Sequence, residues 1–261
     1  MITAVIVLAY ALARFAELPA RQLSANLFGS SIGLELNGQL MLLIMVAALI
    51  STGSETLIRS HPKAESGYSR NALHWILPGW TALALGLMLE LAPTGPVWWL
   101  GMALSAFLLV LVLVTEYTVV DPDDPAYRLA SLGLTALTFI VALALFAWVR
   151  FTGTRAALSA TFTAAMAGLL SLRLFMLNGG ALSRSAMCAG IVGLVVGEAM
   201  WALNYWRVTP TGAGLLLLVL FYVLHGLLGQ HLIGQLTRRT IIEYAAVGAI
   251  GAGIAVALAN P

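Results

Sequence analysis

Long apolar segments follow one another along nearly the whole chain, with short polar connections between them. Their apolar residues are near-continuous and do not alternate with polar ones, which favours helices over the strands of a membrane barrel. About 20 helical residues cross a hydrocarbon core about 30 Å thick. Segments of this length lie near residues 2–18, 32–52, 75–92, 97–119, 127–149, 156–177, 185–205, 213–233 and 240–259. The pattern predicts an all-α fold, a polytopic bundle of about nine transmembrane helices.

The first of these segments is interrupted by charge near its end. Arg14 and Glu17 leave only residues 2–13 uncharged. The segment spans the membrane if both side chains extend to the interface, or it lies on the membrane surface and leaves eight spans. No basic residue precedes the apolar run and no small-residue cleavage motif follows it, so we expect an uncleaved segment rather than a secretory signal.

The composition favours lipid as the main surroundings of the chain. Hydrophobic residues make up 61% of the 261 residues and charged residues 9%, against roughly 25% charged residues in soluble domains. No connection is long enough to form a separate domain, so residues 1–261 are expected to form one transmembrane domain. The net charge of +2, without a basic stripe, argues against a nucleic-acid partner.

The longest polar connection is expected at about residues 53–74, and it holds the single lysine, Lys63. A solvated loop is the simplest interpretation, and a binding or docking loop is the alternative. Cytoplasmic loops are enriched in Lys and Arg. With nine spans, eight of the 13 basic residues share the side of the N-terminus and of this loop: Arg59, Lys63, Arg70, Arg128, Arg173, Arg184, Arg238 and Arg239. This excess predicts that the N-terminus and the loop are cytoplasmic.

Two ionisable residues, Glu198 and His225, are predicted deep within neighbouring spans. Such residues are costly in hydrocarbon and are therefore candidates for function. Measured from the connection between the two spans, their depths differ by roughly 4–8 Å, so a water-bridged couple that carries protons is feasible. The alternative is helix contact, with His225 bonded to a neighbouring hydroxyl or carbonyl group.

Other polar and small residues in the spans have simpler interpretations. Glu35 and Gln39 are four residues apart and would share a helix face, which forms a polar strip that enters from one membrane surface. Glu116 lies near the end of its span and is expected to reach water or headgroups. Gly193 and Gly197 form a small-xxx-small pattern that predicts close helix packing. The last span has a similar small face at Gly248, Gly251, Ala252 and Ala255.

The chain offers no convincing catalytic, metal or cofactor motif. His225 and His231 are six residues apart, about 120° around a helix, so they cannot share a metal ion. Asp121–Pro125, with the sequence DPDDP, reads as a turn rather than a magnesium diphosphate motif. Cys188, Arg207 and His225 occur in the same order as the catalytic residues of membrane cysteine transpeptidases. About one span separates each residue from the next, so the three would lie at different depths in the membrane and could not form a triad. No lysine lies within a span, which excludes a retinal Schiff base.

Two short stretches of the chain resemble a known family. STGSETLIRSHP at residues 51–62 and RRTIIEY at residues 238–244 are similar to segments of an uncharacterised family of bacterial multi-pass membrane proteins. The resemblance implies a helical bundle in a bacterial inner membrane. It implies no catalytic residue, because the family has no assigned activity.

Three functions fit these observations. The first is an accessory subunit of a membrane complex, or a carrier-type protein, that binds other membrane subunits through helix faces and loops. The second is a proton-coupled secondary transporter that uses Glu198 and His225, although the chain lacks the internal repeat that many transporters have. The third is an intramembrane lipid-modifying enzyme entered at Glu35 and Gln39. It ranks last because the sequence offers no recognised nucleophile or metal set, and a non-enzymatic function is favoured.

Overall fold

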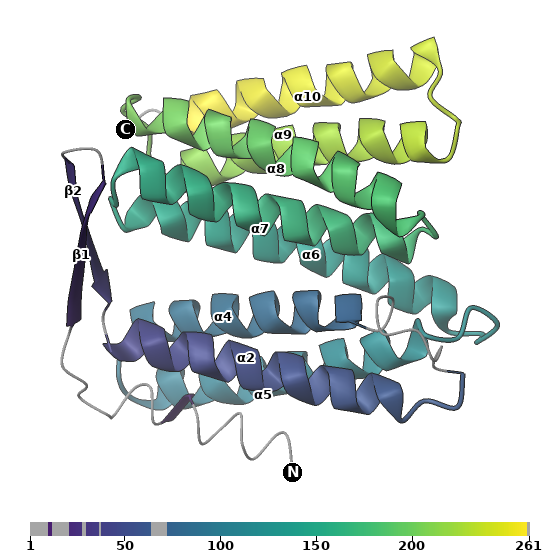
Figure 1. Ribbon diagram of the computed structural model, residues 1–261, viewed down its shortest axis with the longest axis horizontal. Helices are drawn as coiled ribbons and strands as arrows, with labels where there is room; N and C mark the ends of the chain where they lie inside the picture. Colours follow the sequence, from purple (N-terminus) through teal and green to yellow (C-terminus); the bar gives the residue numbers. More distant parts are fainter. Residues whose placement is uncertain (1–9, 12–20, 28–29, 37, 64–71, 260–261) are drawn as a thin grey trace. The chain divides into compact units, whose positions relative to one another are not determined.

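The computed structural model of the protein describes residues 10–11, 21–27, 30–36, 38–63 and 72–259 (Figure 1). Contacts divide the chain into two compact units, unit 1 at residues 1–124 and unit 2 at residues 125–261, and each is described by itself. The single domain expected from the sequence stays a prediction. The predicted first span, at 2–18, lies almost entirely outside the described residues.

Helices dominate both units, as the sequence predicts. The α-helices are α2 (Gly38–Arg59), α4 (Ile76–Leu91), α5 (Pro96–Thr118), α6 (Tyr127–Phe151), α7 (Ala156–Leu177), α8 (Leu182–Asn204), α9 (Pro210–Leu232) and α10 (Arg238–Ala259), and the 3₁₀-helix η1 (Ala72–Trp75) precedes α4. Within the described ranges, seven of them are long and apolar enough to cross a membrane: α2 and α5 to α10. By length and composition they indicate a protein that sits in a lipid bilayer.

The predicted count of about nine spans is not matched. Helix α4 has 16 residues, so it extends only about 24 Å against a hydrocarbon core about 30 Å thick. The apolar run at 75–92 looked longer in the sequence because the apolar end of η1 continues directly into α4. Together with the undescribed segment at 2–18, this leaves seven helices that meet the length of a span.

A β-hairpin replaces the start of the second predicted span. Strand β1 (Arg21–Leu27) pairs antiparallel with β2 (Ser30–Leu36), and Arg21 lies opposite Leu36 in the register. Along β2 apolar residues alternate with Gly and Glu from Ile32 to Leu36, and this period of two suits a strand rather than a helix. The all-helical class therefore holds only outside the hairpin.

Helix α2 is shifted toward the C-terminus relative to the prediction at 32–52. It begins at Gly38 and continues to Arg59, so residues 53–59 of the expected polar connection are helical. The hydroxyl groups in this part bond back to the helix: Ser51 and Thr52 donate to the carbonyl oxygens of residues four earlier, at 2.8 and 2.9 Å. Such bonds let Ser and Thr continue a helix, which explains why a polar stretch did not end it.

Unit 1 is built around α4, which packs against both α2 and α5 (Figure 1). Its core is formed by fully buried aliphatic side chains from the three helices, namely Leu43, Ile58, Ile76, Leu77 and Leu109. The C-terminal ends of α2 and α5 and the N-terminal end of α4 lie at the same end of this unit (Figure 1). The residues that follow α2 and α5, among them Lys63 and Asp121, are therefore brought together.

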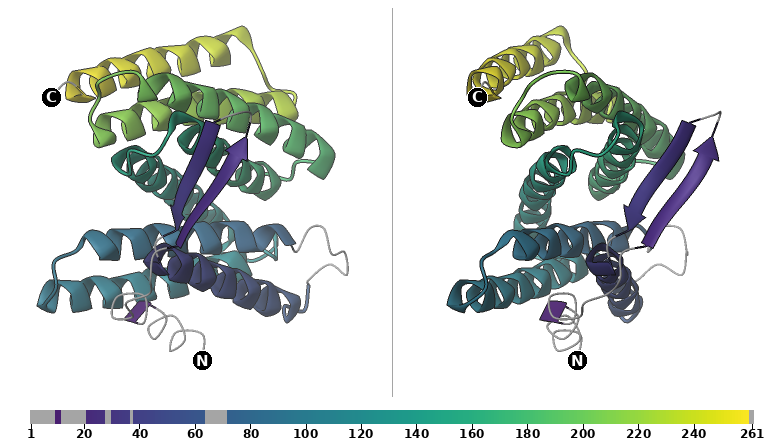
Figure 2. Two further views of the ribbon diagram at one scale, coloured as in Figure 1. Left: turned by 60° about the vertical axis from the view of Figure 1, so that its left-hand side comes forward. Right: turned by 90° about the vertical axis from the view of Figure 1, so that its left-hand side faces the viewer.

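In unit 2, α9 packs against α6, α7, α8 and α10 (Figure 2). The closest helix pair is α7 with α8, and glycines explain it. A Cβ atom added at Gly193 would lie 2.6 Å from the Ala164 carbonyl oxygen and 3.2 Å from the Gly168 Cα, and one at Gly197 would lie 3.0 Å from the Ala160 carbonyl oxygen. The packing role predicted for Gly193 and Gly197 is confirmed.

The small face predicted on the last span also packs against a neighbour. On α10, a Cβ atom at Gly248 would lie 2.9 Å from Val223 Cγ2, and one at Gly251 would lie 2.9 Å from Val219 Cγ2. Both valines belong to α9, which is the helix that α10 chiefly contacts. The outer side of α10 remains exposed and apolar, for example at Ile250, which is 65% exposed.

Proline and glycine residues determine several helix ends, at positions where the sequence predicts the connections between spans. Pro210 begins α9, and the Thr209 hydroxyl oxygen accepts a hydrogen bond from the Gly212 backbone N–H at 3.2 Å, as an N-cap does. At the other end, Gly234 has φ of +71°, and Gln235 N–H donates to the Gln230 carbonyl oxygen at 2.9 Å. This is the Schellman arrangement that ends a helix at glycine.

Candidate functional sites

His225 lies in a packed aromatic environment in unit 2. It is 8% exposed on α9, and its Nδ1 atom is 3.0 Å from the Ser171 hydroxyl oxygen on α7. Its ring is stacked on Phe175 at a centroid distance of 4.4 Å and on Phe221 at 6.0 Å, and Phe139 meets it edge-on at 6.3 Å. A bond to a hydroxyl group of another helix is the arrangement that interhelical contact requires.

Ser171 and His225 also resemble a nucleophile and its base, because a Ser–His hydrogen bond is the first part of a hydrolytic triad. Ser171 is fully buried and His225 is almost so, and the rings of Phe175 and Phe221 stack on the imidazole. A substrate carbonyl would have to reach the Ser171 oxygen through this packing. The contact therefore serves to join α7 and α9.

Glu198 lies apart from this cluster, on an exposed face of α8. Its neighbour in the chain, Gly197, is buried against α7, whereas Glu198 lies about 100° further around the helix and is exposed. Among the residues that the structure describes, no hydrogen bond or ion pair joins Glu198 to His225. A water-bridged couple of the two stays a proposal.

Glu198 interrupts an otherwise apolar exposed face of α8. The face follows helical spacing of three and four residues and ends just after the helix. We call it the α8 outer face, and it comprises Met187, Ile191, Leu194, Glu198, Trp201 and Tyr205. Gly190 lies next to it, and a Cβ atom added at Gly190 would meet nothing within 4 Å. The outer face thus carries one acidic group and one open small position.

Glu35 and Gln39 do not share a helix face. Glu35 is in β2, where it lies opposite Gln22 in the register, and Gln39 is the second residue of α2. The i,i+4 relation that suggested a polar strip requires one continuous helix, and the hairpin ends this continuity. The predicted strip is therefore wrong in its geometry.

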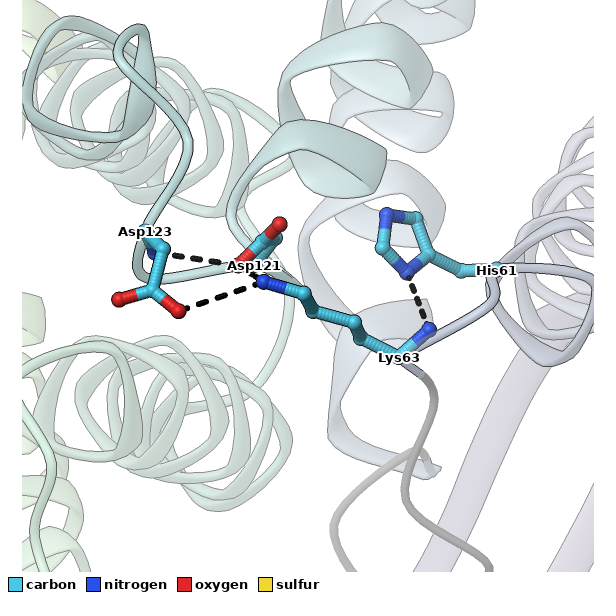
Figure 3. A network of polar contacts seen from close by, with 4 residues as sticks. All are labelled: His61, Lys63, Asp121 and Asp123. Carbon is cyan, nitrogen blue, oxygen red and sulfur yellow. Dashed lines mark hydrogen bonds and ion pairs between the residues drawn. The ribbon is translucent and has the colours of Figure 1, made fainter.

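A polar network at one end of unit 1 joins two segments 58 residues apart in the chain (Figure 3). The Lys63 ammonium group donates to Asp121 Oδ1 at 2.7 Å and to Asp123 Oδ2 at 3.3 Å. Asp121 Oδ1 also accepts from the Asp123 backbone N–H at 3.0 Å, and His61 Nδ1 accepts from the Lys63 backbone N–H at 3.1 Å. The predicted DPDDP turn is confirmed, since Asp124 N–H donates to the Asp121 carbonyl oxygen at 3.2 Å.

These contacts shift the titration of the charged groups. The hydrogen bond from Lys63 holds the pKa of the Asp121 carboxyl below its ordinary value of 3.8, and the bonds to Asp121 and Asp123 raise the pKa of Lys63 above 10.5. Both side chains are partly in solvent, at 20% exposure for Asp121 and 53% for Lys63. The network is a solvent-exposed ion pair that joins the segment after α2 to the segment after α5, rather than a buried charge site.

We expect this ion pair to stabilise the protein at neutral pH and to be lost in acid. Because the folded-state pKa of Asp121 is lowered, the ion pair's contribution to the free energy of unfolding is present above pH 3.8 and is lost as the pH falls through the folded-state pKa. The folded-state pKa of Lys63 is raised, so the contribution of Lys63 is lost only as the pH rises above 10.5. Asp121→Asn should lower the melting temperature in detergent at about pH 7 but leave it unchanged near about pH 2.

Asp123→Asn is the matched control, because its contact is longer and its side chain is 89% exposed. It should change the melting temperature less than Asp121→Asn. Added salt should shrink both effects, since exposed ion pairs are screened. An Asp121→Asn difference of the same size at both pH values would contradict the ion-pair explanation.

A second pair in unit 1 joins the partly exposed His74 to the buried Glu116. His74 lies in η1 and Glu116 in the last turn of α5, and the His74 Nδ1 atom is 2.8 Å from Glu116 Oε2. The side chains are 14% and 1% exposed. The expectation that Glu116 reaches water or headgroups is therefore wrong. Glu116 does lie near the helix end, but its carboxyl group lies against the His74 ring of η1.

Sequence reasoning missed Glu116 as the partner of His74 and Ser171 as the partner of the buried His225. One weak signal was available for Ser171: it is four residues from Phe175, just as Phe221 is four residues from His225, so each pair shares a helix face. This spacing does not predict which helices pack against each other. In the described part of the chain, no three His, Cys, Asp or Glu side chains come close enough to hold a metal ion.

The fold and these sites define a membrane protein with many apolar helices, in which the buried polar groups join helices to one another. The chain belongs to the family described as "Protein of unknown function (DUF5656)", whose family model matches residues 18–258. The resemblance to an uncharacterised family is thereby confirmed. Comparison with curated proteins and with solved structures found no match.

Proposed function

We propose that this protein is an accessory subunit of a complex in the bacterial inner membrane, and that it binds another membrane protein through the α8 outer face. The observation that carries the proposal is Glu198, an exposed carboxylate within an apolar helix face. A face that meets only lipid tails gains nothing from a carboxylate at this position. A face that meets protein can pair it.

The depth of Glu198 supports the proposal. Helix α8 has 23 residues and so extends about 34 Å. Glu198 lies six residues, or about 9 Å, before the end of this helix, which places it several ångströms inside a hydrocarbon core about 30 Å thick. Charged groups at membrane depth are costly and usually face protein or water. Lipid alone therefore explains Glu198 poorly.

Gly190 supplies a second, separate argument. Small residues let transmembrane helices approach closely. The space beside the other glycines in the middle of α8, Gly193 and Gly197, is occupied by α7. Gly190 is exposed and has open space around it. A helix of another protein fits against α8 at this point.

The two alternatives receive less support. A transporter that uses His225 would need a polar cavity around it, whereas three phenylalanine rings and Ser171 surround this residue. An enzyme entered at Glu35 and Gln39 would need them on one face, which they do not share. An accessory subunit needs only an exposed helix face whose residues, here a carboxylate and a glycine, suit contact with protein better than contact with lipid.

We also propose that the polar connection with Lys63 is cytoplasmic. The support is the excess of basic residues on its side of the membrane. Arg173 no longer counts toward this excess, because it is buried within α7 at 3% exposure. Seven basic residues remain on this side, since 8 − 1 = 7, against five on the other.

Gly190→Leu tests the proposal, because it fills the open position without entering the core of unit 2. The protein should still fold and purify from detergent, but its partner should no longer copurify from native membranes. Gly133→Leu is the matched control: Gly133 is an exposed glycine of α6 with nothing within 4 Å of an added Cβ atom. Copurification that survives Gly190→Leu as well as it survives Gly133→Leu would refute the α8 contact.

A further inference from the structure

We propose that the partner at the α8 outer face is a transmembrane helix of a different protein, and that it presents a lysine or arginine side chain to Glu198. This inference rests on the proposed function and names the chemistry of the partner. It commits to one occupant, and a second copy of this chain is an outcome of the test that would overturn it.

The charge on Glu198 decides the chemistry of the partner. In the part of the chain that the structure describes, Glu198 has neither a hydrogen bond nor an ion pair. In a medium of low dielectric, a carboxylate is stabilised most by an opposite charge at close range. An arginine side chain is especially suited, because its guanidinium group binds a carboxylate through two parallel hydrogen bonds.

A second copy of the chain does not supply this charge. Two copies in one membrane share an orientation, so a two-fold contact through the outer face brings residues of equal depth together. Glu198 would then face Glu198, and two carboxylates at close range repel each other. The basic residue of α8, Arg184, lies 14 residues away, which is about 21 Å along the helix. A two-fold contact between two α8 helices therefore brings no basic residue of α8 to either carboxylate.

The position of Gly190 sets the approach of the partner. Gly190 and Glu198 are eight residues apart and so lie about 12 Å apart along the axis. A helix that approaches closely at Gly190 can run along Leu194 and reach Glu198 about two turns later. The basic residue is thus expected about two turns along the partner helix from its closest contact with α8.

Photocrosslinking at Leu194 tests this inference. A photoreactive amino acid at Leu194, 66% exposed on the outer face, should capture the partner in native membranes, and the same group at Ile250 on α10, 65% exposed, is the matched control. The adduct is identified by mass spectrometry. Glu198→Gln should reduce the yield about tenfold. Glu198→Arg should abolish it, and replacing the captured helix's basic residue by glutamate should restore it.

The outcomes separate the two proposals. Without a protein adduct at Leu194 above that at Ile250, both the proposed function and this inference fail. An adduct whose yield in Glu198→Gln stays within about twofold of the wild type, or whose helix lacks a basic residue, leaves the proposed function standing and overturns this inference. An adduct of twice the 27.6 kDa of this chain, made only of the chain itself, also overturns it.

Discussion

Gly193→Leu should destabilise the protein by about 3 kcal/mol or more, because the new side chain has no space between α7 and α8. Even its Cβ atom would lie 2.6 Å from the Ala164 carbonyl oxygen and 3.2 Å from the Gly168 Cα. Both are backbone atoms, so the contact can be relieved only if the two helices move apart. Unfolding in detergent, followed by tryptophan fluorescence, measures the loss.

Gly190→Leu is the control within the same helix. It replaces the same residue type by the same side chain three positions away, where an added Cβ atom meets open space. The purified protein should be as stable as the wild type, or more stable by up to about 1 kcal/mol, since glycine is a poor helix former. Equal destabilisation by the two substitutions would show that the α7–α8 contact does not account for the effect of Gly193→Leu.

His74→Ala should cost about 1–3 kcal/mol, because it removes the ring nitrogen that lies 2.8 Å from the buried Glu116 carboxyl group. Glu116 is 1% exposed and lies 2.8 Å from the His74 ring. The expected result is a lower melting temperature in detergent and earlier exposure of the end of α5 to proteolysis.

Glu116→Gln separates charge from shape in this pair. Glutamine has nearly the same volume and keeps an oxygen that accepts a bond from His74, so it should cost less than His74→Ala. The double variant of both substitutions should lose less stability than the sum of the two single losses, because both substitutions act on the same contact. A double variant as unstable as the sum of the two would show that the two side chains do not act through this contact.

The sequence predicted most helices because their physical causes are local. Continuous apolar runs of about 20 residues are long enough to span lipid, and Pro96 and Pro210 stand at the first position of their helices, where a missing N–H costs little. The contact made by Gly193 and Gly197 was also predictable, because four-residue spacing of small residues serves helix packing wherever the neighbour lies.

The errors arose where the outcome depends on other segments. The alternation from Ile32 to Leu36 was hidden in a run apolar enough for a helix, and a strand forms only with a partner such as β1. Glu116 was judged by its distance from the helix end, but its burial depends on η1, which is 42 residues distant in the sequence at His74. For His225 the sequence gave the type of partner, a hydroxyl group, but not its identity as Ser171.

The attachment of α10 has a consequence for how the protein is made. Its glycine seam chiefly faces α9, the helix that immediately precedes it in the chain. Chains emerge from the ribosome N-terminal end first, so when α10 enters the bilayer its docking surface is already there and only a short turn away. The last helix can close as a hairpin on its predecessor, without any earlier pair having to separate to admit it.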